Sequence, residues 1–123
     1  MRSILVIDDV EQVVFVITMA LAKYGFNVEI ASDGLEGIKK FDEGRFDLVI
    51  TDICMPGLNG NAVVQYVRNS EKHFTPVLGI SGTPWLFGDA GFDAVLSKPF
   101  SIKELVDTVE ILTAEALTSI ATN

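Results

Sequence analysis

Short runs of β-branched and apolar residues alternate along this chain with segments of helical period, and this alternation restricts the fold more than any other feature. Repeated strand and helix units favour a parallel sheet covered by helices, which is an α/β fold. The five predicted strands are Ser3–Ile7, Phe26–Ala31, Phe46–Thr51, Pro76–Ile80 and Asp93–Ser97. Because 123 residues suit one hydrophobic core, we expect a single domain over residues 1–123.

Apolar residues recur at helical spacing between these strands. The spacing predicts helices over Glu11–Tyr24, Leu35–Phe41 and Asn61–Asn69. Ser101 begins a last helix, in a capping box with Glu104, and this helix is long enough to project beyond the sheet. The predicted inward positions of the four helices are Val14, Ile17, Leu21 and Tyr24; Leu35, Ile38 and Phe41; Val63, Val64 and Val67; and Leu105, Val109, Leu112, Ala116 and Ile120.

The segment Thr83–Phe92 does not follow this rhythm. Pro84, Gly88 and Gly91 leave little room in it for a full amphipathic helix, since proline and glycine both disfavour helix interiors. We therefore expect a short turn or a distorted helix at this point of the chain.

Charge and cysteine content argue against several classes of function. Seventeen acidic residues against nine basic ones give a formal charge of −8, which repels nucleic-acid phosphates and anionic membrane surfaces. No stretch reaches the ~20 apolar residues of a membrane span, and Asp8 ends the apolar N-terminus too early for a signal peptide. One cysteine, Cys54, cannot form an internal disulfide. We expect a cytoplasmic protein that binds neither membranes nor nucleic acids directly.

Polar residues gather at the predicted carboxyl ends of the strands. Asp8 and Asp9 follow the first strand, Asp52 the third, Ser81 the fourth and Lys98 the fifth. Ligands of an open parallel sheet bind at this edge, near the point where strand order reverses. Three carboxylates brought together repel one another, and a divalent cation removes that cost. Because oxygen ligands of this kind suit Mg²⁺, the sequence predicts a magnesium site.

The same residues point to phosphoryl chemistry. With a metal in place, Asp52 can serve as a carboxylate nucleophile toward a phosphoryl group. Lys98 offers a positive charge and Ser81 a hydroxyl donor to the phosphoryl oxygens. Each residue alone has a simpler interpretation, because Asp8 and Asp9 suit a solvated turn or helix N-cap. Asp52 could likewise be a loop acid and Lys98 a surface lysine, and only their joint placement favours a site.

Four segments match the signature segments of a known family in order and spacing: ILVIDDV, DLVITDICMPGLNG, ISG and LSKPF. Together they resemble response-regulator receiver domains, and the resemblance covers essentially the whole chain. It implies a flavodoxin-like, doubly wound (βα)5 fold with a five-stranded parallel sheet in the order 2-1-3-4-5. It also implies a phosphoryl-accepting signalling domain of a two-component system.

The resemblance assigns the metal site residue by residue. Asp52 would be the phosphoacceptor. Asp9, Asp52 and the backbone carbonyl of Cys54 would contact Mg²⁺ directly, and Asp8 would act on the metal through water.

The resemblance also implies the surroundings and partners of the phosphoacceptor. Ser81 matches the switch hydroxyl, Lys98 the lysine of the site, and Gly82 the small residue beside the phosphoryl pocket. The peptide bond between Lys98 and Pro99 would be cis. The phosphoryl donor would be the phosphohistidine of a sensor histidine kinase or phosphotransfer protein, or acetyl phosphate. Such a domain is not a conventional enzyme, but it catalyses its own phosphorylation and dephosphorylation and switches binding to a downstream protein.

Two features depart from the family pattern. Val95 stands where the family usually has an aromatic switch residue, which puts aromatic rotamer switching in doubt. The interval from Ser81 to Lys98 is also shorter than in the family, so we expect a truncated fourth helix. Because that helix belongs to the usual output surface, a different output face, involving the long last helix, is one hypothesis.

The sequence favours a stand-alone phosphorylation switch over three other functions. A pseudo-receiver would keep the fold as a protein-binding module without the chemistry, and the intact acids, Ser81 and Lys98 argue against it. A haloacid-dehalogenase-type phosphatase needs an acid two residues after its nucleophile, where this chain has Cys54. Flavodoxin-like cofactor binding needs a hydroxyl- or glycine-rich phosphate loop after the first strand, which Val10, Glu11 and Gln12 do not supply.

Overall fold

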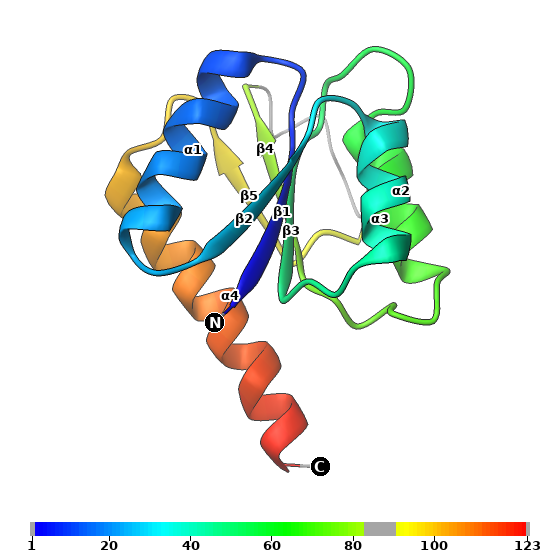
Figure 1. Ribbon diagram of the computed structural model, residues 1–123, viewed down its shortest axis with the longest axis vertical. Helices are drawn as coiled ribbons and strands as arrows, with labels where there is room; N and C mark the ends of the chain where they lie inside the picture. The colour runs from blue at the N-terminus through cyan, green and yellow to red at the C-terminus, as the bar shows by residue number, and fades with distance from the viewer. Residues whose placement is uncertain (1, 83–90, 123) are drawn as a thin grey trace.

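A computed structural model describes residues 2–82 and 91–122 of the chain, with residues 115–122 as backbone only. Five parallel strands form one sheet in the order β2-β1-β3-β4-β5, and helices cover both of its faces (Figure 1). This confirms the predicted α/β fold and its strand order. The strands are β1 (Ser3–Ile7), β2 (Asn27–Ala31), β3 (Leu48–Asp52), β4 (Val77–Ser81) and β5 (Ala94–Ser97). The helices are α1 (Glu11–Lys23), α2 (Gly34–Glu43), α3 (Gly60–Arg68) and α4 (Ile102–Thr122).

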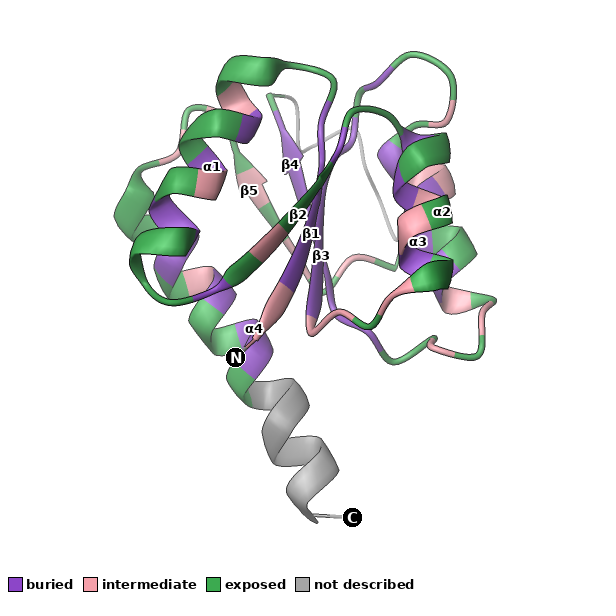
Figure 2. Cartoon of the chain, in the orientation of Figure 1, coloured by how far each residue is buried: buried purple, intermediate pink, exposed green. Residues whose placement is uncertain are grey.

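Two hydrophobic cores lie on opposite faces of the sheet. Successive strand residues point to opposite faces, so every central strand contributes to both cores. In β1, Ile4 and Val6 pack with α1 and α4, whereas Leu5 and Ile7 pack with α2 and α3. Figure 2 shows β1, β3 and β4 almost entirely buried, as expected for parallel strands covered on both sides.

The strand order reverses at β1, because β2 pairs with one side of this strand and β3 with the other. The register pairs Ile7 of β1 with Thr51 of β3. The residues next in the chain, Asp8 and Asp52, therefore lie side by side at the carboxyl edge of the sheet. This is the place where doubly wound folds bind ligands.

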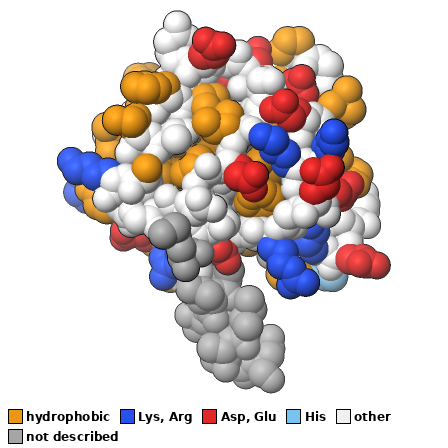
Figure 3. Space-filling view, in the orientation of Figure 1, with side chains coloured by type: hydrophobic (Ala, Val, Ile, Leu, Met, Phe, Trp, Pro, Cys, Tyr) orange, Lys and Arg blue, Asp and Glu red, His pale blue; other side chains and the backbone are white. Residues whose placement is uncertain are grey.

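Most of the predicted inward positions that the structure describes are confirmed, and two, Tyr24 and Leu35, are wrong. Val14, Ile17 and Leu21 of α1 are buried, as are the predicted residues of α3, Val63, Val64 and Val67. Tyr24 is 56% exposed, because α1 ends before it and Tyr24 is only the C-cap residue. The sequence of α1 is apolar nearly all round, and Figure 3 shows hydrophobic side chains over its outer face. Its pattern therefore marks the inward stripe poorly.

The inward face of α2 also differs from the prediction. Leu35 is 70% exposed and Ile38 half-buried, while Gly34, Gly37 and Phe41 are the buried residues of α2. A Cβ atom on Gly37 would lie 2.4 Å from Cδ1 of Ile7. Because α2 approaches the sheet at Gly37, its contact stripe contains a residue that a search for apolar side chains passes over.

The last helix, α4, begins as predicted and runs past the end of the sheet (Figure 1). Leu105, Val109 and Leu112 are buried against the sheet, while the side chains of Ala116 and Ile120 lie outside the described residues. The turn or truncated helix predicted over Thr83–Phe92 falls almost wholly on residues outside the described ranges and stays a prediction. Within the described part of the chain, no helix combines the length and hydrophobicity needed to cross a bilayer.

The predicted capping box is confirmed at the start of α4. The amide of Glu104 donates to Oγ of Ser101 at 3.0 Å, and the amide of Ser101 donates to Oε1 of Glu104 at 3.4 Å. We expect Ser101→Ala to lower the free energy of unfolding by about 1 kcal/mol, because it leaves a helix N-terminal amide without its acceptor. Urea unfolding measures this change. Ser101→Asp, which keeps an acceptor, should retain most of the stability, and equal loss in both variants would contradict the capping role.

Candidate functional site

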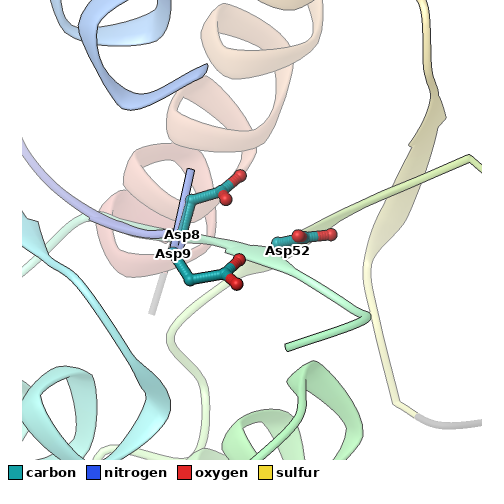
Figure 4. A group of neighbouring side chains, drawn as sticks. All are labelled: Asp8, Asp9 and Asp52. Carbon is teal, nitrogen blue, oxygen red and sulfur yellow. The ribbon is translucent and has the colours of Figure 1, made fainter. Parts of the chain in front are cut away.

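The five residues predicted to form a site all lie at the carboxyl edge of the sheet. Asp8 and Asp9 follow β1, and Asp52 and Ser81 are the last residues of β3 and β4. Lys98 directly follows Ser97, the last residue of β5. Figure 4 shows the carboxylates of Asp8, Asp9 and Asp52 gathered in one place. One oxygen from each of the three lies within 4.8 Å of the others. This confirms the prediction that the three carboxylates lie close together.

Asp8 and Asp9 differ sharply in environment. Asp8 is 2% exposed and Asp9 is exposed. The Asp8 amide donates to the Ala31 carbonyl, and its Oδ1 accepts a hydrogen bond from the amide of Val10 at 2.9 Å. These contacts continue the pairing of β1 with β2 by one residue and fix the Asp8 carboxylate where α1 begins.

Asp52 is held by the backbone around it. It is 5% exposed, and its carbonyl accepts from Oγ1 of Thr51 at 2.9 Å. The amide of Ile53 donates to Ile80, and the amide of Gly60 donates back to Ile53 at the start of α3. A Cβ atom on Gly60 would lie 2.7 Å from the Asp52 carbonyl oxygen. Only glycine therefore lets α3 begin this close to the acidic cluster.

Lys98 brings a positive charge to this acidic cluster. Its Nζ lies 3.5 Å from Oδ2 of Asp52. Its amide donates to the carbonyl of Ser81 at 2.8 Å, so β4 and β5 stay paired up to the site. The peptide bond between Lys98 and Pro99 is cis, as predicted. Ser81 is buried beside them at 1% exposure.

Burial perturbs the two inner carboxyl groups. It raises the pKa of Asp8 to about 6, and the nearby Asp52 and Asp9 add to this rise, against the opposing effects of the Val10 amide and Lys98. Burial also raises the pKa of Asp52, although Lys98 and the amide of Cys54 act in the other direction. Both carboxyl groups thus lack enough positive charge from the protein alone to offset their burial.

One carboxylate oxygen of the cluster, Oδ2 of Asp8, is buried without a hydrogen bond from the described residues. An unsatisfied buried carboxylate oxygen is costly, and native structures contain few of them. A cation beside the three carboxylates would satisfy this oxygen and offset their repulsion. The all-oxygen donor set fits Mg²⁺, which prefers carboxylates and water.

Three further residues singled out from the sequence lie nearby. The thiol of Cys54 is exposed, and metal binding by its carbonyl stays a prediction. Gly82 is exposed, and no described residue has an atom within 4 Å of the position of an added Cβ. Val95 is 37% exposed on the edge strand β5.

Comparison with known proteins identifies one family. The model of the response regulator receiver domain matches residues 4–110. The alkaline phosphatase synthesis transcriptional regulatory protein PhoP of Bacillus subtilis is 33% identical over 109 residues, covering 85% of this chain and 45% of PhoP. The transcriptional regulatory protein TrcR of Mycobacterium tuberculosis is 34% identical over 108 residues, covering 84% of this chain and 42% of TrcR. The chain thus spans less than half the length of these curated relatives.

Solved structures show the same likeness. The response regulator protein TrrA of Thermotoga maritima, crystallised in complex with Mg²⁺-BeF, has a TM-score of 0.85 and 31% identity, covering 91% of this chain and 99% of TrrA. The chemotaxis response regulator CheY4 of Vibrio cholerae has a TM-score of 0.84 and 30% identity, covering 91% of this chain and 98% of CheY4. Because the family model spans most of the residues and these solved structures share the fold, the chain belongs to the response regulator receiver domain family.

Proposed function

We propose that residues 1–123 form one receiver domain that accepts a phosphoryl group on Asp52 and thereby changes its affinity for a protein partner. One observation carries the proposal. The Asp52 carboxylate ends a buried strand, within 4.8 Å of oxygens from Asp8 and Asp9 and 3.5 Å from the Lys98 ammonium group. A carboxylate nucleophile needs positive charge beside it, here from Lys98 and from a cation bound by the acids, because the phosphoryl group that it attacks is itself negatively charged.

The residues of the chain have distinct tasks in this proposal. A carboxylate oxygen of Asp52 attacks phosphorus and forms an acyl phosphate, while the bond from phosphorus to the donor nitrogen or oxygen breaks and its electron pair leaves with the donor. Lys98 and Ser81 donate hydrogen bonds to the phosphoryl oxygens, which stabilises the charge spread over them. Ser81 ends β4 and Lys98 follows β5, and both strands lie on the same side of β3 in the sheet.

The acidic cluster would hold Mg²⁺ through Asp8, Asp9, Asp52 and the carbonyl of Cys54. When bound, Mg²⁺ supplies positive charge to the phosphoryl oxygens during transfer. The unsatisfied Oδ2 of Asp8 supports this part of the proposal, since a water or cation at that atom would remove its desolvation cost.

We propose the phosphohistidine of a sensor histidine kinase or phosphotransfer protein as the physiological donor, with acetyl phosphate as a small-molecule substitute. The downstream partner is proposed to be a protein rather than a nucleic acid or a membrane, in line with the net charge of −8. A cytoplasmic location agrees with such partners and stays a prediction from the sequence.

The proposal is tested by incubating the protein with acetyl phosphate and Mg²⁺ and measuring intact mass. We expect one phosphoryl adduct per chain, which a chelator prevents and which Asp52→Asn does not form. Asp47→Asn is a control, because it changes a carboxylate outside the cluster. An adduct of equal yield in Asp52→Asn, or one that forms in the presence of chelator, would contradict the proposal. A complete lack of adduct in the wild-type protein would instead favour the phosphorylation-independent binding module.

A further inference from the structure

The guanidinium group of Arg68, at the end of α3, has an acceptor for every one of its N–H groups. Arginine carries five N–H donors in a fixed planar fork. Nε and Nη2 donate to the carbonyl of Gly91 at 3.1 and 2.9 Å, and Nη2 also donates to Oδ2 of Asp93 at 2.6 Å. Nη1 donates to the carbonyls of His73 and Thr75 at 2.8 and 2.7 Å. One side chain thus links α3 to two separate stretches of chain.

Those two stretches lead into β4 and β5. His73 and Thr75 precede β4, and Gly91 and Asp93 precede β5. Asp93 is joined directly to the first residue of β4, because its Oδ2 also accepts from the amide of Val77 at 2.7 Å and its amide donates to the Val77 carbonyl at 2.9 Å. Arg68 and Asp93 therefore fix where the two strands begin relative to each other.

The two strands differ in how firmly they are held. All five residues of β4 are buried. β5 has four residues, lies at the edge of the sheet, and alternates between half-buried and exposed positions. The register of a strand with little buried surface is weakly specified by its own side chains. The beginning of β5 therefore needs another source of order, and the Arg68–Asp93 pair is placed there.

The far ends of the same strands carry the two groups proposed to contact the phosphoryl oxygens. Ser81 ends β4, and Lys98 follows β5 with its amide bonded to the Ser81 carbonyl at 2.8 Å. A shift of β5 along β4 would move the Lys98 ammonium group away from Asp52. The carboxylates proposed to hold the metal follow β1 or end β3, and Arg68 contacts neither strand through any of these five bonds.

We infer that Arg68, acting through Asp93, is a positioning residue that keeps β5 in register with β4 and so places Lys98 relative to Ser81 and Asp52. This inference rests on the proposed function, since it assigns Lys98 and Ser81 a task in phosphoryl transfer. The ion pair itself is partly exposed, with side-chain exposures of 26% and 41%, so its Coulombic contribution to stability is small. Arg68 therefore acts on phosphoryl transfer mainly through the position that it gives to Lys98.

The test compares Arg68→Met and Arg68→Lys with a control, Lys103→Met, which breaks the exposed ion pair of Lys103 and Asp107 on α4. In Arg68→Met we expect the initial rate of phosphorylation by acetyl phosphate and the affinity for beryllofluoride to fall about tenfold, because small misplacements near a reacting group are costly. The affinity for Mg²⁺ alone should stay unchanged. Arg68→Lys, with fewer and non-planar donors, should fall between Arg68→Met and the wild type.

Amide hydrogen exchange provides a readout that does not depend on phosphorylation. The Lys98 amide should exchange faster in Arg68→Met, while the amide of Val6 in β1 keeps its protection, because the opening is local to β5. If Arg68→Met does not fold, Asp93→Asn tests the same contact with the side-chain shape retained. The inference is overturned if Lys98 exchange and beryllofluoride affinity match the Lys103→Met control. It is also overturned if Mg²⁺ affinity and Val6 protection fall by the same factor. A wild-type protein that takes no phosphoryl group would defeat the proposed function, and the exchange result would still decide the positioning role.

Discussion

Replacing Lys98 by methionine should lower the rate of phosphorylation by acetyl phosphate by a factor of about 10² to 10³, the usual effect of removing one charged or hydrogen-bonding group that stabilises a transition state. The Lys98 ammonium group lies 3.5 Å from Oδ2 of Asp52. Methionine keeps the length and much of the volume of the side chain but removes the charge. Rapid-quench or mass-based rate measurements at fixed Mg²⁺ concentration give the ratio directly.

The same substitution should act on Mg²⁺ affinity in the opposite direction. A lysine beside three carboxylates competes electrostatically with a cation, so its removal should leave Mg²⁺ affinity equal to or higher than that of the wild type. Lys98→Arg should recover only part of the rate, because a planar guanidinium group does not replace a compact ammonium group. Lys103→Met is the matched control. A Lys98→Met rate within a few-fold of the control would remove Lys98 from the mechanism.

The metal-free protein should lose stability as pH rises from about 4 to about 6, and Asp8 should cause much of this loss. Burial raises the pKa of Asp8 from 3.8 in the unfolded chain to about 6 in the folded protein. Between these values the folded state holds a proton that the unfolded state has released, so stability falls as pH increases. This rise in the pKa corresponds to a loss of roughly 3 kcal/mol in the free energy of unfolding, which is complete above pH ~6. Burial of Asp52 acts in the same direction.

Urea unfolding at pH 5 and pH 7.5 in the presence of chelator measures this loss. Asp8→Asn should lose much less stability between these pH values and be more stable than the wild type at pH 7.5 without metal. Glu29→Gln, at an exposed position, should behave like the wild type. Mg²⁺ should stabilise the wild type more at pH 7.5 than at pH 5, because it binds the ionised carboxylate. An identical pH slope in Asp8→Asn and wild type would show that Asp8 is not the group responsible.

The fold was predictable from sequence where burial is strongest. The central strands β1, β3 and β4 are continuous apolar runs, covered on both faces, and such runs are recognisable without knowledge of their neighbours. The inward face of α2 was not predictable, because Gly37 meets Ile7 and a glycine carries no hydrophobic signal. Tyr24 was misassigned because α1 has apolar residues on every side.

The site was predictable as a set of strand-end residues, but its internal differences were not. Adjacent acids in a sequence look alike, yet Asp8 is buried and Asp9 exposed, since successive residues after β1 point in opposite directions. The pair of Arg68 and Asp93 was missed, because it joins residues 25 positions apart and only the fold brings them together. A weak signal existed: aspartate is disfavoured in strands, so an aspartate at the predicted start of β5 called for a separate explanation.

The central claim, that Asp52 itself carries the phosphoryl group, is tested most directly by locating the modified residue in the wild-type protein. Borohydride reduces an aspartyl phosphate to homoserine, and peptide mass spectrometry then identifies the position. The account predicts homoserine at position 52 after treatment with acetyl phosphate and Mg²⁺, with Asp8 and Asp9 unmodified. Homoserine at position 8 or 9, or an adduct on a side chain outside the acidic cluster, would contradict it.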